Sequence, residues 1–155
     1  MDYRLATVDD IPQLARTRWD FRAEAGEEPL EGADAFERRY AAFARQALES
    51  RAWVYWVATD SGRIVSHIAV NVVRGVPRPS RKSDQWGYLT DCYTRPEYRG
   101  RGVGSELMAH VKEWATKQDL EFMLVWPSED SQSFYERAGF GPADGVAQLT
   151  LRAHT

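Results

Sequence analysis

The chain has 155 residues, a length that fits one domain with a full hydrophobic core. Apolar residues make up 43% of it and charged residues 28%, a composition that is typical of folded globular proteins and excludes a disordered one. The formal net charge of −3 lacks the basic excess of nucleic-acid-binding proteins, so we expect no nucleic-acid partner. Cys92 is the only cysteine, and no apolar run approaches the ~20 residues of a membrane helix. We therefore expect a single domain over residues 1–155, located in the cytoplasm and without a membrane partner.

Strand and helix signals alternate in the first fifty residues. Residues 3–6 predict a short strand, and residues 7–10 carry the residue types that begin helices. Apolar residues then recur with helical spacing from Ile11 to Trp19. A break with two glycines, residues 26–32, separates this helix from a second one, which is predicted for residues 34–47.

The middle of the chain carries strand signals. Residues 53–58 and 63–73 are rich in β-branched and aromatic residues and flank a turn at residues 60–62, so they predict a β-hairpin. Residues 74–84 contain two prolines and four basic residues and predict a loop. A further strand is predicted for residues 86–94.

The last third returns to alternating helix and strand. Helical spacing predicts a helix over residues 102–117, and the nearly continuous apolar run 120–126 predicts a strand covered on both faces. A short helix is expected over residues 128–138, and a final strand over residues 148–152. The order β-α-α-β-β-β-α-β-α-β predicts an α+β fold. We expect a mixed, twisted sheet of six to seven strands flanked by about four helices.

A glycine-rich segment, Arg99-Gly100-Arg101-Gly102-Val103-Gly104-Ser105, joins a predicted strand to a predicted helix. Glycines allow the backbone to approach a ligand closely, and a helix N-terminus offers unpaired N–H donors and partial positive charge. The segment therefore indicates an anion-binding site.

Other glycine-rich motifs and segments give alternative interpretations of this pattern. A phosphate-binding P-loop would end in Gly-Lys-Ser/Thr, which is missing, and the dinucleotide pattern would require glycine at Ser105. A tight glycine turn between strand and helix remains open as an alternative. An RGG-like RNA-binding segment is disfavoured by the helix that follows.

Two motifs resemble those of the GNAT superfamily of N-acetyltransferases. Arg99-x-x-Gly102-x-Gly104, after a strand that ends Tyr93-Thr94-x-Pro96-Glu97-Tyr98, resembles the acetyl-CoA signature of that superfamily. Phe134-Tyr135-Glu136-x-x-Gly139-Phe140 resembles its second motif. The order of elements also matches, so the resemblance covers essentially the whole chain. It implies transfer of an acetyl group from acetyl-CoA to a primary amine of a small molecule or peptide by direct attack, without a metal. Homodimers are common in the superfamily.

The resemblance also implies roles for particular residues. The segment that would hold the cofactor pyrophosphate consists of Arg99, Gly100, Arg101, Gly102, Val103, Gly104 and Ser105. The strand end that would run beside the pantetheine arm, and polarise the thioester carbonyl through an N–H, consists of Cys92, Tyr93 and Thr94. This strand splays from the next one in the superfamily, which opens the cleft. Where family members often carry Asn and Ala, the chain has Ser128 and Ser131, which still offer hydrogen bonds to the cofactor arm.

Candidate catalytic residues follow from the same resemblance. Tyr135 would donate a proton to the leaving thiolate, although helical periodicity alone favours simple packing. Asp91 is a candidate general base for a separate reason, because a carboxylate in a largely apolar strand requires an explanation; the alternatives are an ion pair with a neighbouring arginine and a side chain that faces solvent. Cys92 is interpreted as a small buried residue because direct transfer needs no acyl-enzyme. His67 and Asn71 share a face of one strand and either line the cleft or serve the structure.

The break between the first two helices is acidic, with Glu24, Glu27, Glu28 and Glu31. These residues would form an acidic lip for a cationic amine if they border the acceptor site, and otherwise a solvated loop. A second function stays open for the whole chain, namely a non-catalytic acyl-CoA-binding or sensing module of the same fold.

Overall fold

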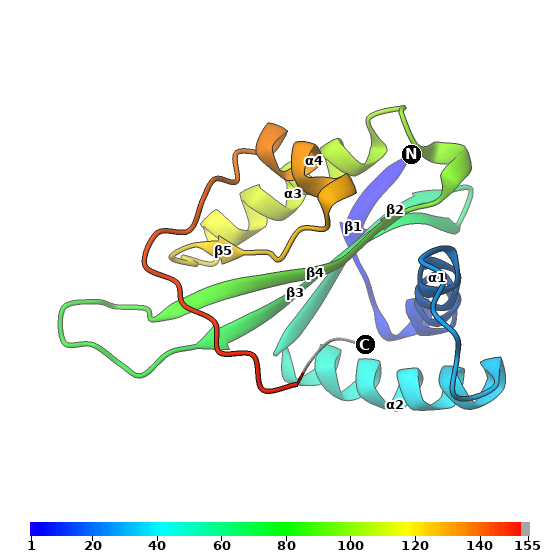
Figure 1. Cartoon of the computed structure of the whole chain (residues 1–155), viewed down its shortest axis with the longest axis horizontal. Helices are drawn as coiled ribbons and strands as arrows, with labels where there is room; N and C mark the ends of the chain where they lie inside the picture. The colour runs from blue at the N-terminus through cyan, green and yellow to red at the C-terminus, as the bar shows by residue number, and fades with distance from the viewer. Residues whose placement is uncertain (153–155) are drawn as a thin grey trace.

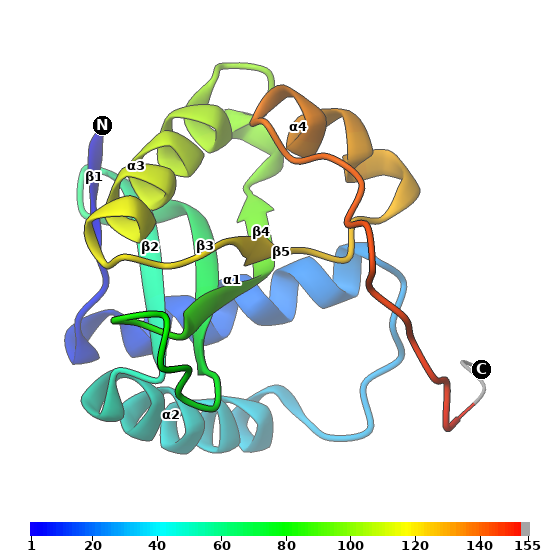
Figure 2. The ribbon, with the colours of Figure 1, turned by 90° about the vertical axis from the view of Figure 1, so that its left-hand side faces the viewer.

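The structure is a computed structural model that describes residues 1–152. One sheet separates two layers of helices, with α1 and α2 on one face and α3 and α4 on the other (Figures 1 and 2). The strands are β1 (Asp2–Leu5), β2 (Trp53–Asp60), β3 (Arg63–Arg74), β4 (Gln85–Thr94) and β5 (Met123–Leu124). The helices are α1 (Ile11–Glu24), α2 (Ala33–Ser50), α3 (Val103–Lys117) and α4 (Gln132–Arg137), with 3-10 turns at Val8–Asp10, Pro96–Tyr98 and Glu129–Ser131.

The five strands described within residues 1–152 lie in sequence order, β1-β2-β3-β4-β5. The first four pair antiparallel, whereas β4 and β5, which are joined by α3, pair in parallel. That parallel pairing is limited to Gly87 with Met123 and Tyr88 with Leu124. The mixed α+β sheet and the four helices agree with the sequence prediction, but six to seven strands is wrong for residues 1–152.

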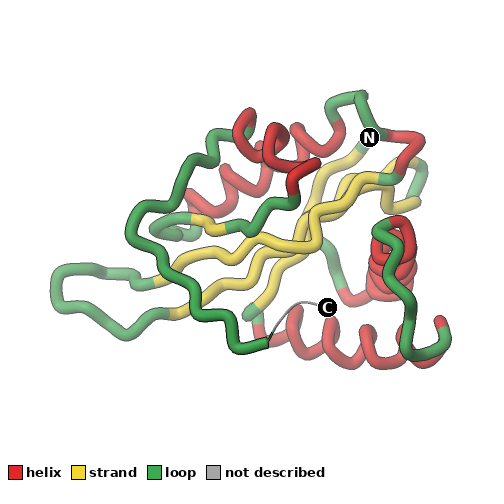
Figure 3. Tube along the Cα trace, in the orientation of Figure 1, coloured by secondary structure: helices red, strands yellow, loops and turns green. Residues whose placement is uncertain are grey.

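Two predicted strands account for this difference. In the run 120–126 only Met123 and Leu124 form a strand, and no residue of the run is fully buried, so a strand covered on both faces is wrong. The ladder stops because β5 diverges from β4 after two residue pairs. Residues 148–152 form no strand (Figure 3), and Leu149 and Leu151 are 82% and 84% exposed. An alternating apolar pattern gives a strand only where a neighbouring strand completes its hydrogen bonds.

Each face of the sheet carries its own core. On one face, Leu107 and Val111 of α3 pack against Ile68, Val70 and Leu89 of the central strands. On the other face, residues of α1 and α2 pack against β2 and β3, namely Ile11, Leu14, Ala15, Tyr40 and Ala44 against Tyr55, Val57, Ile64 and Ala69. Because both faces of β3 are covered, the strands that lead to the site are held rigidly.

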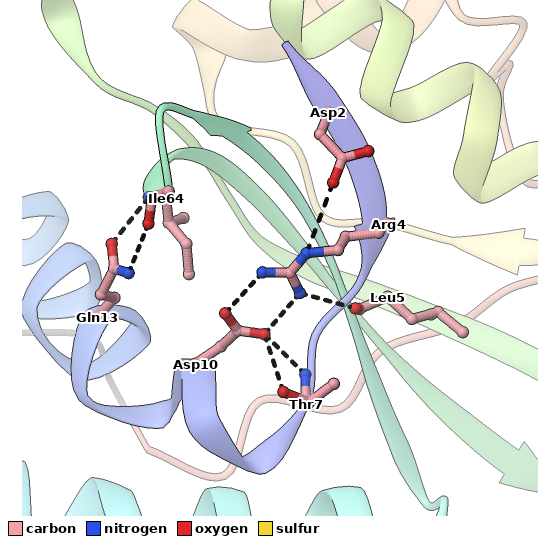
Figure 4. A network of polar contacts seen from close by, with 8 residues as sticks. Asp2, Arg4, Leu5, Thr7, Asp10, Gln13 and Ile64 are labelled. Carbon is pink, nitrogen blue, oxygen red and sulfur yellow. Dashed lines mark hydrogen bonds and ion pairs between the residues drawn. The ribbon is translucent and has the colours of Figure 1, made fainter.

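Polar contacts fix the start of α1 (Figure 4). The Arg4 guanidinium donates to both carboxylate oxygens of Asp10 at 2.7 and 2.9 Å, and the Thr7 N–H donates to Asp10 at 2.8 Å. The hydrogen bond from Arg4 outweighs burial and lowers the pKa of Asp10 below its usual range. Gln13 bonds the β2–β3 turn through Gly62 and Ile64. These contacts hold α1 against the sheet. No helix within residues 1–152 has the length and apolar character needed to cross a membrane.

Candidate active site

The glycine-rich segment forms the connection between β4 and α3. Gly100 and Gly102 have φ of +70° and +79°, in the left-handed region that favours glycine. The backbone N–H groups of residues 100–105 have no acceptor among residues 1–152, and a Cβ placed on Gly102 would meet no atom within 4 Å. A Cβ on Gly104 would lie 3.2 Å from the Thr94 hydroxyl oxygen, so this glycine lets α3 begin close to β4. Converging N–H donors at a helix N-terminus form an anion site.

A cavity of about 350 Å³ lies over this segment. It is lined by Thr94, Tyr98, Arg99, Gly100, Gly102, Val103, Gly104, Ser105, Phe134 and Arg137. Seven of these residues were predicted from the sequence. Arg137 of α4 was not, although it adds a cation to the cavity wall. Arg101 does not line the cavity, and its guanidinium lies 5.7 Å from the ring of Tyr98.

Arg99 connects the segment to α1. Its Nε donates to the Thr94 carbonyl at 2.8 Å, and its terminal nitrogen donates to Glu24 at 2.7 Å. The same Glu24 carboxylate accepts a hydrogen bond from the Tyr93 hydroxyl, and the Tyr93 ring stacks on Phe21. Tyr93 therefore faces α1. It lines neither this cavity nor the cavity between β4 and β5.

A second cavity, of about 310 Å³, lies where β4 and β5 diverge; we call it the cleft. It is lined by Tyr88, Leu89, Thr90, Asp91 and Cys92 of β4, by Val125, Trp126, Ser128, Ser131 and Tyr135, and by Arg18, Phe21 and Arg22 of α1. Asp91, Cys92, Ser128, Ser131 and Tyr135 were all predicted from the sequence as site residues. The separation of β4 from β5 was expected from the family resemblance and is present here.

Tyr135 and Cys92 meet in the cleft. Both side chains line it, and the Tyr135 ring packs edge-on against Phe134 and Phe140, with ring centres 5.1 and 5.6 Å apart. Burial raises the pKa of the Cys92 thiol to about 12 and raises the pKa of Tyr135 well above its ordinary value. Both groups are therefore protonated at neutral pH, and Tyr135 can act as a proton donor.

Asp91 lies on a β-bulge. The register passes from Ala69 opposite Thr90 to His67 opposite Tyr93, so β4 holds one extra residue, and Asp91 has a φ of +50°. Such a backbone conformation is strained for a residue other than glycine, although Asp and Asn tolerate it best.

The buried Asp91 carboxylate is paired with two groups. Its Oδ1 accepts a hydrogen bond from Arg18 at 3.1 Å and lies 3.1 Å from Nε2 of His67, although that contact is not well aligned for a hydrogen bond. Burial raises the pKa of Asp91, but the combined effect of His67 and Arg18 is larger and lowers it below the ordinary value. The arginine pair that the sequence left open is therefore present, and a role as general base stays a prediction.

His67 and Asn71 do not line the cleft. His67 is fully buried among aromatic rings beside Asp91, and the Asn71 amide donates to the Ala52 carbonyl at 2.9 Å. Both side chains serve the structure around the bulge and the strand end.

The acidic break between α1 and α2 is largely neutralised. Glu27 pairs with Arg22, and Glu31 pairs with Arg39, while Glu24 pairs with Arg99 as described above. Glu27, Glu28 and Glu31 line a third cavity of about 310 Å³, which also contains apolar side chains of both helices. Because arginines balance three of the four glutamates, the segment is not the unbalanced acidic lip that the sequence left open.

The model of the acetyltransferase (GNAT) family matches residues 13–140. The chain belongs to this family. Its GNAT fold is also found in a crystal structure with acetyl-CoA of a protein described as a predicted acetyltransferase from Clostridium acetobutylicum. That likeness has a TM-score of 0.81 and 23% identity, over 97% of this chain and 96% of the other. A GCN5-related N-acetyltransferase from Ralstonia eutropha JMP134 gives a TM-score of 0.77 and 25% identity, over 96% and 97%.

One curated protein is similar over part of the chain. Glucosamine 6-phosphate N-acetyltransferase of Trypanosoma brucei brucei is 29% identical over 91 residues, which is 59% of this chain. The match spans 60% of that relative. The family resemblance that was inferred from the two motifs is thus confirmed.

Sequence reasoning missed Arg18, Arg22 and Arg137 of this GNAT site, and it missed the contact between Glu24 and Arg99. Arg18 contacts Asp91 across 73 positions of sequence, and Glu24 contacts Arg99 across 75. Arg18 and Arg22 are spaced i, i+4, which places them on one face of a predicted helix and was the available signal. Nothing local in the sequence indicated the approach of Arg137 to the glycine-rich segment.

Asp91→Asn is expected to lower the free energy of unfolding at pH 7 by roughly 2–4 kcal/mol, because it leaves Arg18 and His67 without their anion. Asparagine tolerates the left-handed backbone, so the lost free energy of unfolding reflects the removed charge and not backbone strain. The lowered pKa means that the ionised carboxylate stabilises the fold above pH ~4, and that this contribution is lost as the pH falls through the folded-state pKa. In urea unfolding, the difference in free energy of unfolding between the parent and Asp91→Asn should therefore become smaller below pH ~4. A difference in free energy that does not depend on pH would contradict a stabilising role of the ionised Asp91 carboxylate.

Proposed function

We propose that this GNAT protein transfers an acetyl group from acetyl-CoA to a primary amine by direct attack. The observation that carries the proposal is the row of backbone N–H groups at residues 100–105, which have no acceptor among residues 1–152. They lie at the N-terminus of α3, beside a cleft that contains a buried tyrosine hydroxyl. Family membership and the structural likeness to a protein solved with acetyl-CoA support it.

The residues that line the two cavities would bind different parts of the cofactor. The segment 99–105 would hold the pyrophosphate, and Arg137 would add a cation beside it. Cys92 to Thr94 would run along the pantetheine arm. Ser128 and Ser131 are bonded to each other, with 2.9 Å between their hydroxyl oxygens, and would contact the arm from the opposite wall.

The chemistry requires two proton transfers. The neutral amine nitrogen attacks the thioester carbonyl carbon, the carbon–sulfur bond breaks, and the sulfur leaves as a thiolate. Tyr135 would give its proton to that sulfur, and Asp91 would accept the amine proton directly or through water. A backbone N–H near the bulge would stabilise the developing oxyanion.

The test is an amine-panel assay that follows release of the CoA thiol. We expect steady release of the CoA thiol when an amine is present, with the acetylated amine as the product. Binding of acetyl-CoA without release for every amine would favour the non-catalytic acyl-CoA-binding module. The name of the curated relative supports an amine acceptor. A location in the cytoplasm and a homodimer remain predictions.

A further inference from the structure

Helix α1 brings two arginines to the cleft. Arg18 and Arg22 lie one helical turn apart, and both line the cavity that also contains Cys92 and Tyr135. Their guanidinium carbons lie 5.9 and 5.3 Å from the centre of the Phe21 ring, so the two cations flank one aromatic side chain. Their side chains are 33% and 38% exposed, and the cavity gives a ligand access to them.

The negative charge in the cleft does not satisfy both arginines. Asp91 is the single carboxylate among the described residues that line it, and this carboxylate is shared between Arg18 and His67. The partner of Arg22 is Glu27, whose side chain is 51% exposed outside the cleft. An exposed ion pair of this kind contributes little and exchanges readily with other anions. Burial, and after it the nearby charge of Arg18, lower the pKa of Arg22, while the nearby Asp91 carboxylate raises it by less.

We propose that the acceptor carries an anionic group, a phosphate or a carboxylate, beside its primary amine, and that Arg22 together with Arg18 binds this group. The inference rests on the proposed acetyltransferase function and names the class of its acceptor. A guanidinium presents a planar fork of N–H donors that matches either anion. The anion would lie at α1, so the amine of the same molecule would reach the wall formed by Cys92 and Tyr135. An acidic lip would select a cationic acceptor, whereas these arginines select an acceptor with negative charge.

The test compares acceptors that differ only in the anion. The pairs are glucosamine 6-phosphate with glucosamine, O-phosphoethanolamine with ethanolamine, and tyrosine with tyramine. We expect kcat/KM to be about 10- to 100-fold higher for the anionic member of at least one pair. The first two pairs report a phosphate and the third a carboxylate, so the pair that responds identifies the anion.

Two variants should change this preference in opposite directions. Arg22→Met keeps most of the side-chain length and removes the charge, and it should abolish the preference. Glu27→Gln releases Arg22 from its partner, and it should raise kcat/KM for the anionic acceptor several-fold. Arg16→Met is the matched control, because Arg16 is exposed on the same helix and lines neither the cleft nor the cavity over residues 99–105.

The outcomes separate this inference from the function on which it rests. Thiol release with no preference for anionic amines, or a preference that survives Arg22→Met, would overturn the inference and leave the acetyltransferase function standing. If acetyl-CoA binds but no amine of the panel reacts, the three anionic amines are titrated calorimetrically into the CoA-loaded protein. Binding that Arg22→Met weakens at least ten-fold supports the inference, and no such binding overturns it. Failure to bind acetyl-CoA at all would instead remove the proposed function.

Discussion

Replacing Tyr135 by phenylalanine is expected to lower kcat by roughly ten- to a thousand-fold, which corresponds to about 1.4–4 kcal/mol of transition-state stabilisation. The leaving thiolate would have a conjugate acid with a pKa near ~8.5, and a phenol that is protonated at neutral pH can hydrogen-bond or protonate it. Burial keeps the Tyr135 hydroxyl protonated, and Tyr135 lines the cleft together with Cys92. Phenylalanine preserves the ring and its contacts with Phe134 and Phe140. Affinity for acetyl-CoA should therefore change little.

Steady-state kinetics and calorimetric titration of acetyl-CoA check this expectation. Tyr40→Phe is the control, because Tyr40 is a buried tyrosine of α2 in the core on the other face of the sheet. It should keep the parental kcat. If Tyr135→Phe also kept the parental kcat, Tyr135 would be a packing residue, and water or another group would protonate the thiolate.

Gly102→Asp is expected to weaken acetyl-CoA binding by about a hundred-fold or more, with the fold retained. The left-handed φ of +79° disfavours most side chains, but Asp and Asn tolerate it best, and no atom lies within 4 Å of the position of a Cβ. The aspartate would extend over N–H groups that have no acceptor among residues 1–152 and would put negative charge where an anion is to bind.

Gly102→Asn is the matched control for this substitution. It has nearly the same shape and the same backbone tolerance but no charge, so the difference between the two variants reports the electrostatics of the site. Calorimetry should show a much smaller loss for Asn, and thermal unfolding should show both variants folded. If Gly102→Asp and the parent bound acetyl-CoA with equal affinity, the pyrophosphate would not bind at this segment.

Local patterns predicted the parts of the fold that depend on neighbouring residues. The hairpin of β2 and β3, the helix from Val103 and the glycine-rich connection each follow from residues within one short stretch, and they occur where expected. Residues 120–126 differ because an apolar run does not reveal whether a neighbouring strand follows it to its end. Here the ladder stops after Leu124, and that interruption makes room for the cleft.

The candidate site was predictable to a similar extent. Glycines and the tyrosine of α4 belong to motifs with fixed spacing, so they were assigned from the sequence. The environment of Asp91 depends on Arg18, which approaches from another element, and on a bulge that the strand pattern does not encode. The charge of the acidic break was misleading for the same reason, since the arginines that pair with the glutamates are identified only by the folded arrangement.

The single cysteine affects how the proposed activity can be assayed. Activity is to be followed with a disulfide reagent that reacts with released CoA thiol, and a protein thiol could contribute background colour. Here that background is limited to one thiol per chain, Cys92, whose pKa is raised to about 12. Because burial raises this pKa, little of the thiol is in the reactive thiolate form at pH 8. The protein can therefore be used at high concentration in a continuous assay, and slow release of CoA thiol with a poor acceptor would be measurable without a cysteine-free variant.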